Sequence, residues 1–537
     1  MRDTRYGQSL ITFAPEFSTP YFNFFLRMKK IMLLLSAALL SAGTSQAQNQ
    51  AGACGTQPDE LLKNQLLANI ATLKAGDIAT PRNAIQYVPV FFHLVGDGQG
   101  NGKVQESKVL DQLCVLNADY APMDIRFYLS PHPVTGALFN YGINNNNVYS
   151  NQTAFVTMNN ARHPNALNVY IVDDAGSNGN SITLAYYHTQ HDWVVARRDQ
   201  INGTVGNAVL PHEVGHFFSL LHTFNGWESN PFDPSDLSWP VAQFISPDGV
   251  TPTEKMNGTN WASAGDFIQD TPPDYNFGLG YSGCNYTAGA KDPNGTLVDP
   301  MENNMMGYFL DCTTHEFTND QQALILTDLG SSHRNYLHNS YVPPATTITT
   351  PSNFLIAPAN GATVQYYNNV TLEWNAVAGA TYYLLEVDFL SANPQAYIVN
   401  TTSKVLTNLN PNKLYQWRVR PFNEYVTCAN AQQRQFRTST VATSTQEIAG
   451  LTDWQVAPNP AQANAPVSLF VRAENTFTAN IRVFDATGRQ VYAQDRVDFP
   501  AGDKTVELPL SGLQAGLYFI ALQNNVGQQV RKLSVVR

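Results

Sequence analysis

Residues 212–224 read HEVGHFFSLLHTF, a stretch that places three histidines and one glutamate at close spacing. Residues four apart on a helix share one face, so His212 and His216 can reach the same ion while Glu213 stands beside them. Catalytic zinc takes three protein ligands and keeps a fourth position open for water, and His222 follows at a spacing that supplies the third. The pattern therefore predicts a zinc site built on a helix.

The chemistry expected of such a site is hydrolysis. Zinc lowers the pKa of a water molecule that it binds towards about 7 and polarises the carbonyl under attack. Glu213 is then the general base, and later the donor of a proton to the leaving amine, rather than a ligand. We therefore expect a zinc endopeptidase that hydrolyses proteins or peptides.

Two other functions remain open at this point. The chain could be a surface binding or adhesion protein, weakly active or inactive, that keeps a metalloprotease fold, or a zinc hydrolase that acts on something other than peptides. Glu213 favours the enzyme, because a protein that only binds has no chemical need for a carboxylate at this position.

The sequence around this stretch alternates between strand-like and helix-like patterns. Such alternation is typical of an α/β domain with helices packed on a sheet, which we place at residues 86–342. Apolar β-rich runs predict strands at 87–95, 125–129 and 167–172, and apolar residues at helical spacing predict helices at 106–119 and about 211–221.

A second segment, Asn304-Met305-Met306-Gly307-Tyr308, adds a family resemblance. With residues 212–224 it resembles the active-site segments of the pappalysin family of metzincin zinc metallopeptidases. Residues 87–95, 115–120 and 265–272 also look like their pappalysin counterparts, so the resemblance covers roughly residues 50–335. It implies a metzincin-like catalytic domain with a twisted sheet and an active-site helix.

The resemblance also implies roles for two residues of the second segment. Met306 would be the Met-turn methionine beneath the zinc, although its residue type alone also fits an ordinary core methionine. Tyr308 would be the tyrosine that can hydrogen-bond the tetrahedral intermediate, and so belongs to the expected catalytic residues.

Ser219 departs from the metzincin pattern, which has a glycine at this position. That glycine ends the helix in a conformation that swings the third histidine back to the zinc. Glycine reaches a positive φ without strain, whereas serine incurs a cost of about 1 kcal/mol or more. We expect zinc binding to survive, because binding by three histidines offsets far more than that.

The cysteines carry two further expectations. Cys284 and Cys312 lie on either side of the Met-turn segment and form a disulfide in an oxidising compartment, as the resemblance also implies. Cys54 resembles a cysteine-switch position, where a thiolate occupies the open position of the zinc until the segment is cleaved. A disulfide between Cys54 and Cys114 is the alternative. Acidic side chains around Asp266 and Asp270 could hold structural Ca2+, as in some relatives.

The N-terminal region predicts export. Residues 28–47 have a basic start, an apolar run of about ten residues and a small-residue cleavage site, typical of a secretory signal peptide and too short for a transmembrane helix. Residues 1–27 precede this signal, and we interpret them as a mis-assigned upstream start. Residues 48–85, with one helical pattern at 60–70, look like a pro-segment.

The C-terminal third changes to short alternating strands. After a linker, residues 353–438 have the texture of a β-sandwich and resemble a fibronectin type III module. Residues 450–537 resemble the C-terminal sorting domain of type IX secretion cargo, through Pro458-Asn459-Pro460, residues 483–488, 513–520 and 531–536. This second resemblance implies the type IX machinery as a partner and passage from the periplasm across the outer membrane to the cell surface or medium.

The charge balance limits the other partners. With 31 Lys+Arg against 42 Asp+Glu among 537 residues, the formal net charge is -11. A negative chain without a basic stripe repels phosphate backbones, so we expect no nucleic-acid partner. The sequence thus predicts a multidomain exported protein, with an α/β catalytic domain followed by two all-β sandwich domains.

Overall fold

The computed structural model describes the chain from residue 54 onward with short gaps. The predicted upstream start and signal peptide, residues 1–47, therefore lie outside the described residues. The described residues are 54–56, 59–76, 85–150, 154–176, 183–203, 208–233, 235, 241–279, 281–309, 311–389, 394–441, 448–510, 512–524 and 527–537. The chain divides into two compact units, with the change near Val342.

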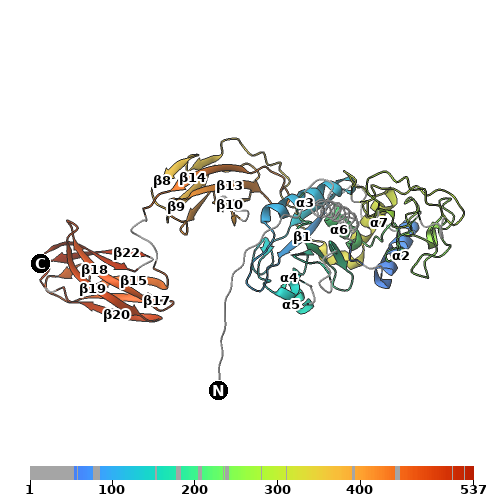
Figure 1. The fold of residues 1–537 in the computed structure, drawn as a ribbon. Coiled ribbons are helices and arrows are strands. Elements are labelled where there is room, and N and C mark those ends of the chain that lie inside the picture. Colours follow the sequence, from blue (N-terminus) through green and yellow to red (C-terminus); the bar gives the residue numbers. More distant parts are fainter. Residues whose placement is uncertain are drawn as a thin grey trace, which may run out of the picture. The chain divides into compact units, whose positions relative to one another are not determined.

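The first unit is built on one six-stranded sheet (Figure 1). Its strands follow the order β2-β1-β4-β6-β5, and the short β3 pairs with β1. β5 runs antiparallel to β6 at one edge, whereas the other pairs are parallel. The strands are β1 (Gln86–Leu94), β2 (Ile125–Leu129), β3 (Phe139–Asn140), β4 (Leu167–Val172), β5 (Ala185–His188) and β6 (Trp193–Arg197).

The burial of the strands in this sheet explains the apolar runs of the sequence. All six residues of β4 are buried, as expected for a parallel strand covered on both faces. The predicted strand at 125–129 and helix at 106–119 have the same bounds in the structure as β2 and α3. The helices are α2 (Glu60–Ala75), α3 (Glu106–Asp119), α4 (Asn146–Ser150), α5 (Phe155–Ala161), α6 (Val209–Phe217) and α7 (Asn319–Leu329), with short 3-10 turns that include η4 (Ser332–Leu337).

Helix α2 extends beyond the predicted residues 60–70. Asp59 caps its start by accepting a hydrogen bond from the Leu62 N–H over 2.8 Å, and Gly76 ends it with a φ of 74°. Its buried side chains include Leu62 and Leu66, and it packs along α7 (Figure 1). The segment predicted as a pro-segment therefore contributes a buried helix face to this unit.

Helix α6 is shorter than predicted. The expected helix at 211–221 ends at Phe217, because Ser219 takes a φ of 70°, which no right-handed helix accommodates.

The first β-rich module folds as two facing sheets. One sheet has the order β11-β10-β13-β14-β8 and the other β12-β9-β7, and Trp374 and Trp417 are buried in the core that they share. β9 alternates buried and exposed residues, as a strand with one face on a core must. The strands are β7 (Leu355–Ala357), β8 (Ala362–Val364), β9 (Val370–Trp374), β10 (Tyr382–Asp388), β11 (Gln395–Val399), β12 (Ser403–Leu406), β13 (Leu414–Phe422) and β14 (Gln432–Thr438).

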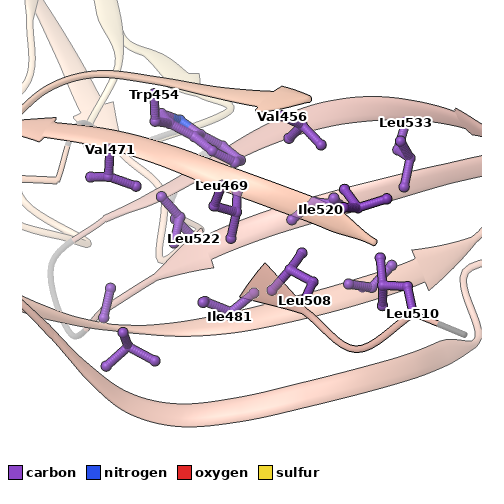
Figure 2. Packing of buried hydrophobic residues seen from close by; sticks show 14 of the residues in the cluster. Trp454, Val456, Leu469, Val471, Ile481, Leu508, Leu510, Ile520, Leu522 and Leu533 are labelled. Carbon is purple, nitrogen blue, oxygen red and sulfur yellow. The ribbon is translucent and has the colours of Figure 1, made fainter. Parts of the chain in front are cut away.

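The C-terminal module is a second two-sheet arrangement, with orders β15-β17-β20 and β16-β22-β21-β18-β19. Figure 2 shows the apolar side chains between its sheets, where Trp454, Leu469, Ile481 and Leu522 point toward one another. The strands are β15 (Leu451–Ala457), β16 (Ala461–Gln462), β17 (Val467–Ala473), β18 (Phe477–Asp485), β19 (Gln490–Phe499), β20 (Gly502–Leu508), β21 (Gly516–Gln523) and β22 (Gln528–Val536).

No helix within the described residues is long and apolar enough to cross a membrane.

Candidate metal centre

Helix α6 carries two of the candidate ligands on one buried face. The Nδ1–H of His212 donates to the carbonyl of Met305 over 2.7 Å, and that of His216 donates to the carbonyl of Leu220 over 2.7 Å. A carbonyl only accepts, so each ring keeps its proton on Nδ1 and its lone pair on Nε2. Both imidazoles are thus oriented by backbone groups in the way that metal-binding histidines usually are.

The turn after α6 brings in the third histidine. The N–H of Ser219 donates to the carbonyl of His216 over 2.9 Å, and Leu220 N–H donates to Gly215 over 3.1 Å. After this turn, Nε2 of His222 lies 3.1 Å from Nε2 of His216. Ser219 therefore adopts the left-handed conformation, with a φ of 70°, that glycine reaches without strain.

The four side chains at this point form a compact set of metal-ligating atoms. Donor atoms of Cys54, His212, His216 and His222 all lie within 4.8 Å of one another. Nε2 of His212 is buried and has no hydrogen-bond partner. An orphaned lone pair facing two further imidazoles and a thiol fits a zinc ion, for which nitrogen and sulfur are the preferred ligand atoms.

Burial keeps the imidazoles of His212 and His216 neutral. It lowers the pKa of His212 to about 3 and, with the charges of the neighbouring histidines, that of His216 well below its usual range. Neutral imidazole is the form that binds metal.

Glu213 stands beside this set without belonging to it. Its Oε2 accepts a hydrogen bond from the Thr56 hydroxyl over 2.8 Å, and its side chain is buried. Burial raises the pKa of this carboxyl to about 7, the range in which a group both takes up and releases protons.

Met306 and Tyr308 border the same centre from the other side. A Cβ atom on Gly215 would lie 2.4 Å from Sδ of Met306, so only glycine in α6 allows the methionine to pack directly beneath the helix. The Tyr308 hydroxyl lies 3.4 Å from Nε2 of His222 and donates to the carbonyl of Cys54 over 3.3 Å.

Residues 54–56 lie along β5, the edge strand of the sheet. Gly55 N–H donates to the carbonyl of Ala185 over 2.7 Å, and the N–H of Tyr187 donates to the Thr56 hydroxyl over 2.8 Å. Cys54 is a free thiol whose pKa is raised by burial and by the charge of Glu213. Cys114 is itself disulfide-bonded, so the alternative bridge from Cys54 to Cys114 is wrong.

The sequence did not single out several residues that the structure places here. Glu228 lies 3.5 Å from Nδ1 of His222, and Thr56 reaches Glu213 from far along the chain.

A small cavity of about 30 Å³ adjoins the site. Its lining residues are Cys54, Leu184, Ala208, Val209, His212, Glu213, Gly307, Tyr308 and His315.

The cysteine pair near Tyr308 forms a disulfide. Cys284 and Cys312 are bonded, with Cα atoms 4.9 Å apart. The bridge closes the loop of residues 284–312, which contains the Met306 segment.

The acidic residues near 266 separate into two environments. Asp266 is fully buried, and its Oδ2 has no hydrogen-bond partner, as is also true of Oε2 of the buried Glu254. Burial raises the pKa of both carboxyls, and the neighbouring charge of Asp266 adds to the rise for Glu254. Asp270 instead accepts from the Thr318 hydroxyl over 2.6 Å and from Asp320 N–H over 2.9 Å at the start of α7.

Known proteins resemble this chain over up to about half of its length. An extracellular metalloprotease of Sordaria macrospora is 26% identical over 321 residues, which cover 56% of this chain and 95% of that protein. One from Colletotrichum graminicola is 29% identical over 212 residues, covering 36% of this chain and 72% of that protein. A Neurospora crassa extracellular metalloprotease is 24% identical over 321 residues, 56% of this chain and 95% of its own.

Solved structures also align with parts of this chain. The fibronectin FN1-FN3 domains of chicken CNTN1 align with 33% of this chain and 66% of theirs, at 15% identity and a TM-score of 0.15. A fibronectin domain of human collagen alpha-1(XX) aligns with 19% of this chain and 99% of its own, at 23% identity and a TM-score of 0.14. These scores are too low to support an argument.

Residues 455–536 match the family model described as a secretion system C-terminal sorting domain. The predicted sorting domain and the predicted export across the outer membrane are thus confirmed. The chain is an exported protein similar to extracellular metalloproteases.

Proposed function

We propose that the chain is a secreted zinc endopeptidase of the metzincin type, made as a latent precursor. The observation that carries this proposal is the convergence of His212, His216 and His222 with Glu213 beside them and an edge strand, β5, next to the site. The similarity to extracellular metalloproteases supports the same activity.

Each residue of the site has its own role in the proposed peptide hydrolysis. Three imidazoles hold the zinc, which when bound polarises the scissile carbonyl and makes water a better nucleophile. Glu213 takes the proton from the attacking water and passes it to the leaving amine. The Tyr308 hydroxyl donates a hydrogen bond to the oxyanion as it develops. The substrate backbone pairs with β5, in the place that residues 54–56 take in the precursor.

Latency follows from the position of residues 54–56. The Cys54 thiol lies among the three imidazoles and takes the ligand position that a substrate would need, and Thr56 engages Glu213. Removal of this segment by proteolysis frees both. The pappalysin subtype, suggested by the resemblance of residues 50–335, is supported by the packing of Met306 against Gly215.

The buried pair of Glu254 and Asp266 favours a structural Ca2+ site in the same domain. Each of these carboxyls keeps a buried oxygen without a partner, and burial raises the pKa of both because it disfavours their charged forms. A cation bound between them would stabilise the charged forms. The Thr271 hydroxyl donates to Asp266 over 2.8 Å, which fixes that carboxylate in place. Carboxylate oxygens are the ligands that Ca2+ prefers.

We also propose the remaining domain roles. Residues 48–85 are the pro-segment and 86–342 the catalytic domain. Residues 353–438 form a fibronectin type III-like module, and residues 450–537 engage the type IX secretion machinery.

The experiment that tests the proposed function compares the exported protein with its Glu213→Gln and His222→Ala variants. We expect the wild type to cleave denatured casein and to hold about one zinc per chain. Glu213→Gln should keep the zinc and lose activity by at least about 100-fold, because it removes the base and keeps the shape. His222→Ala should lose both, whereas His333→Ala, at an exposed histidine in η4, should lose neither.

Two results would contradict the proposal. Equal zinc loss in Glu213→Gln and His222→Ala would overturn the roles assigned to them. Zinc binding without cleavage of any protein, even after residues 48–85 are removed, would favour the surface binding protein instead.

A further inference from the structure

The turn that brings His222 to the site is held from outside by helix α2. Asn69 in α2 donates from Nδ2 to the Ser219 hydroxyl oxygen over 2.8 Å, and the same nitrogen lies 2.8 Å from Oδ1 of Asp328 in α7. Asn69 and Ser219 are both buried, with 5% and 0% of their surface exposed. A buried amide that bonds two partners in fixed positions is held in one orientation.

Asp328 continues the connection to the end of the active-site helix. Its Oδ2 accepts from Nε of Arg334 over 2.8 Å, and Arg334 is fully buried. The guanidinium of Arg334 also donates to the carbonyl of Phe217 and lies 3.8 Å from the centre of the Phe217 ring. Phe217 is the last residue of α6, so this network reaches both ends of the turn, at Phe217 and at Ser219.

The hydrogen bond from Asn69 matters because of the backbone conformation of Ser219. A serine at a φ of 70° is strained, and a glycine would adopt the same backbone without strain. Serine has a hydroxyl that glycine lacks, and in the structure this hydroxyl accepts the Asn69 hydrogen bond. A buried hydrogen bond contributes stabilisation of the same order as the strain.

We propose that Asn69 is a positioning residue for the zinc site: helix α2 acts as an internal template that holds the Ser219 turn, and thereby His222, in the metal-binding geometry. This rests on the proposed function and extends it to the regulation of the site. When α2 leaves with the pro-segment, Ser219 loses the partner that offsets its strain. The zinc is then held more firmly in the precursor than the three histidines alone would hold it.

The test is a double-mutant cycle in the full-length chain that carries Glu213→Gln, so that the precursor is not processed. The readouts are the rate of zinc transfer to a chelating dye and the thermal unfolding midpoint with and without zinc. Asn69→Leu removes the hydrogen bonds and keeps the size of the side chain. Gln65→Leu is the matched control, because Gln65 donates to Asp328 over 2.6 Å from the same helix, whereas among the described residues the Ser219 hydroxyl is bonded by Asn69.

We expect Asn69→Leu to speed zinc transfer about five- to tenfold, the effect of one buried hydrogen bond. Gln65→Leu should lower the unfolding midpoint and leave zinc transfer unchanged. In a Ser219→Gly background, Asn69→Leu should no longer affect zinc transfer, because neither the hydroxyl nor the strain remains. Ser219→Ala, which keeps the strain and removes the acceptor, should match Asn69→Leu and serves if that variant does not fold.

Two results would overturn the proposal and make Asn69 a packing residue only. In the first, Asn69→Leu changes the rate of zinc transfer equally in the Ser219 and Ser219→Gly backgrounds. In the second, Asn69→Leu and Gln65→Leu change that rate equally. A wild-type chain that binds no zinc would instead overturn the proposed function. In that case the coupling between Asn69 and Ser219 in the unfolding midpoint of the metal-free chain would still be measurable.

Discussion

The hydroxyl of Thr56 donates a hydrogen bond to Oε2 of Glu213 over 2.8 Å, while the N–H of Tyr187 in β5 donates to the same hydroxyl oxygen over 2.8 Å. One side chain thus joins the proposed general base to the edge strand. A peptide paired with β5 must displace it, and water cannot occupy the position of its hydroxyl. In the proposed precursor, residues 54–56 would therefore block Glu213 as well as the proposed zinc ligands.

Thr56→Val removes this block and keeps the β-branched shape. We expect the uncleaved precursor to show about fivefold more residual peptidase activity, because loss of one buried hydrogen bond favours release of residues 54–56 from the cleft. The measurement is hydrolysis of a quenched fluorescent peptide before processing. Thr72→Val is the matched control, since the Thr72 hydroxyl bonds only to the Ala68 carbonyl on the surface of α2. Residual activity equal to that of the control would mean that Cys54 alone maintains latency.

Tyr308→Phe tests the contact with the reacting carbonyl. The hydroxyl now donates to the carbonyl of Cys54, a backbone group that takes the place of a substrate group. We expect kcat to fall about 10- to 100-fold with little change in KM, because a hydrogen bond to a developing oxyanion is stronger in the transition state than in the bound substrate. Steady-state kinetics of the processed enzyme provide both constants, and zinc content checks that the site is intact. A KM that rises while kcat is unchanged would assign Tyr308 to substrate binding.

The sequence predicted the elements that rest on local patterns. The apolar runs at 125–129 and 167–172 became β2 and β4 with the same bounds, and the helical pattern at 106–119 became α3. The spacing of His212, Glu213 and His216 fixes their relation on one helix, because helical geometry requires it.

Contacts between distant segments could not be predicted in this way. No periodicity connects Thr56 with Glu213, or Asn69 with Ser219, because these pairs are separated by 157 and 150 residues and meet only through the packing of α2 and residues 54–56 on the folded domain. Glu254 was missed for the same reason, and Asp270 was grouped with Asp266 because it is close in sequence. In the structure Asp270 caps α7 instead.

That difference between two aspartates leads to a prediction about calcium. Chelation of Ca2+ should lower the thermal unfolding midpoint of the wild type by several degrees, because it removes a ligand that binds the buried pair of Glu254 and Asp266 in the folded chain and not in the unfolded one. Asp266→Asn should abolish the response to Ca2+. Asp270→Asn should keep it, since Asp270 is exposed and bonds to the start of α7. The measurement is a calcium titration of the unfolding midpoint, and a response retained by Asp266→Asn would remove the proposed site.

The cavity beside the site would widen when Cys54, one of its lining residues, leaves with the proposed pro-segment. Its other lining residues lead to a prediction about the side chains that the proposed enzyme accepts next to the scissile bond. Apart from Glu213, the proposed base, the described residues that line it include no acidic residue and no lysine or arginine, and its walls include Leu184, Val209 and His315. The His315 ring donates from Nε2 to the carbonyl of Phe309 over 3.0 Å, and burial lowers its pKa, so the ring is neutral. A lysine or arginine side chain would find no fixed counter-charge there, and burial of an unpaired charge is costly.

We therefore expect the proposed enzyme to cleave beside uncharged residues. The measurement is mass spectrometry of the products from a peptide library. His315→Asp should add cleavage beside lysine and arginine, because it supplies the missing carboxylate. His338→Asp, at a histidine that bonds to the Leu329 carbonyl away from the cavity, is the control and should leave the preference unchanged. Efficient cleavage beside arginine by the wild type would show that this cavity does not receive the substrate side chain.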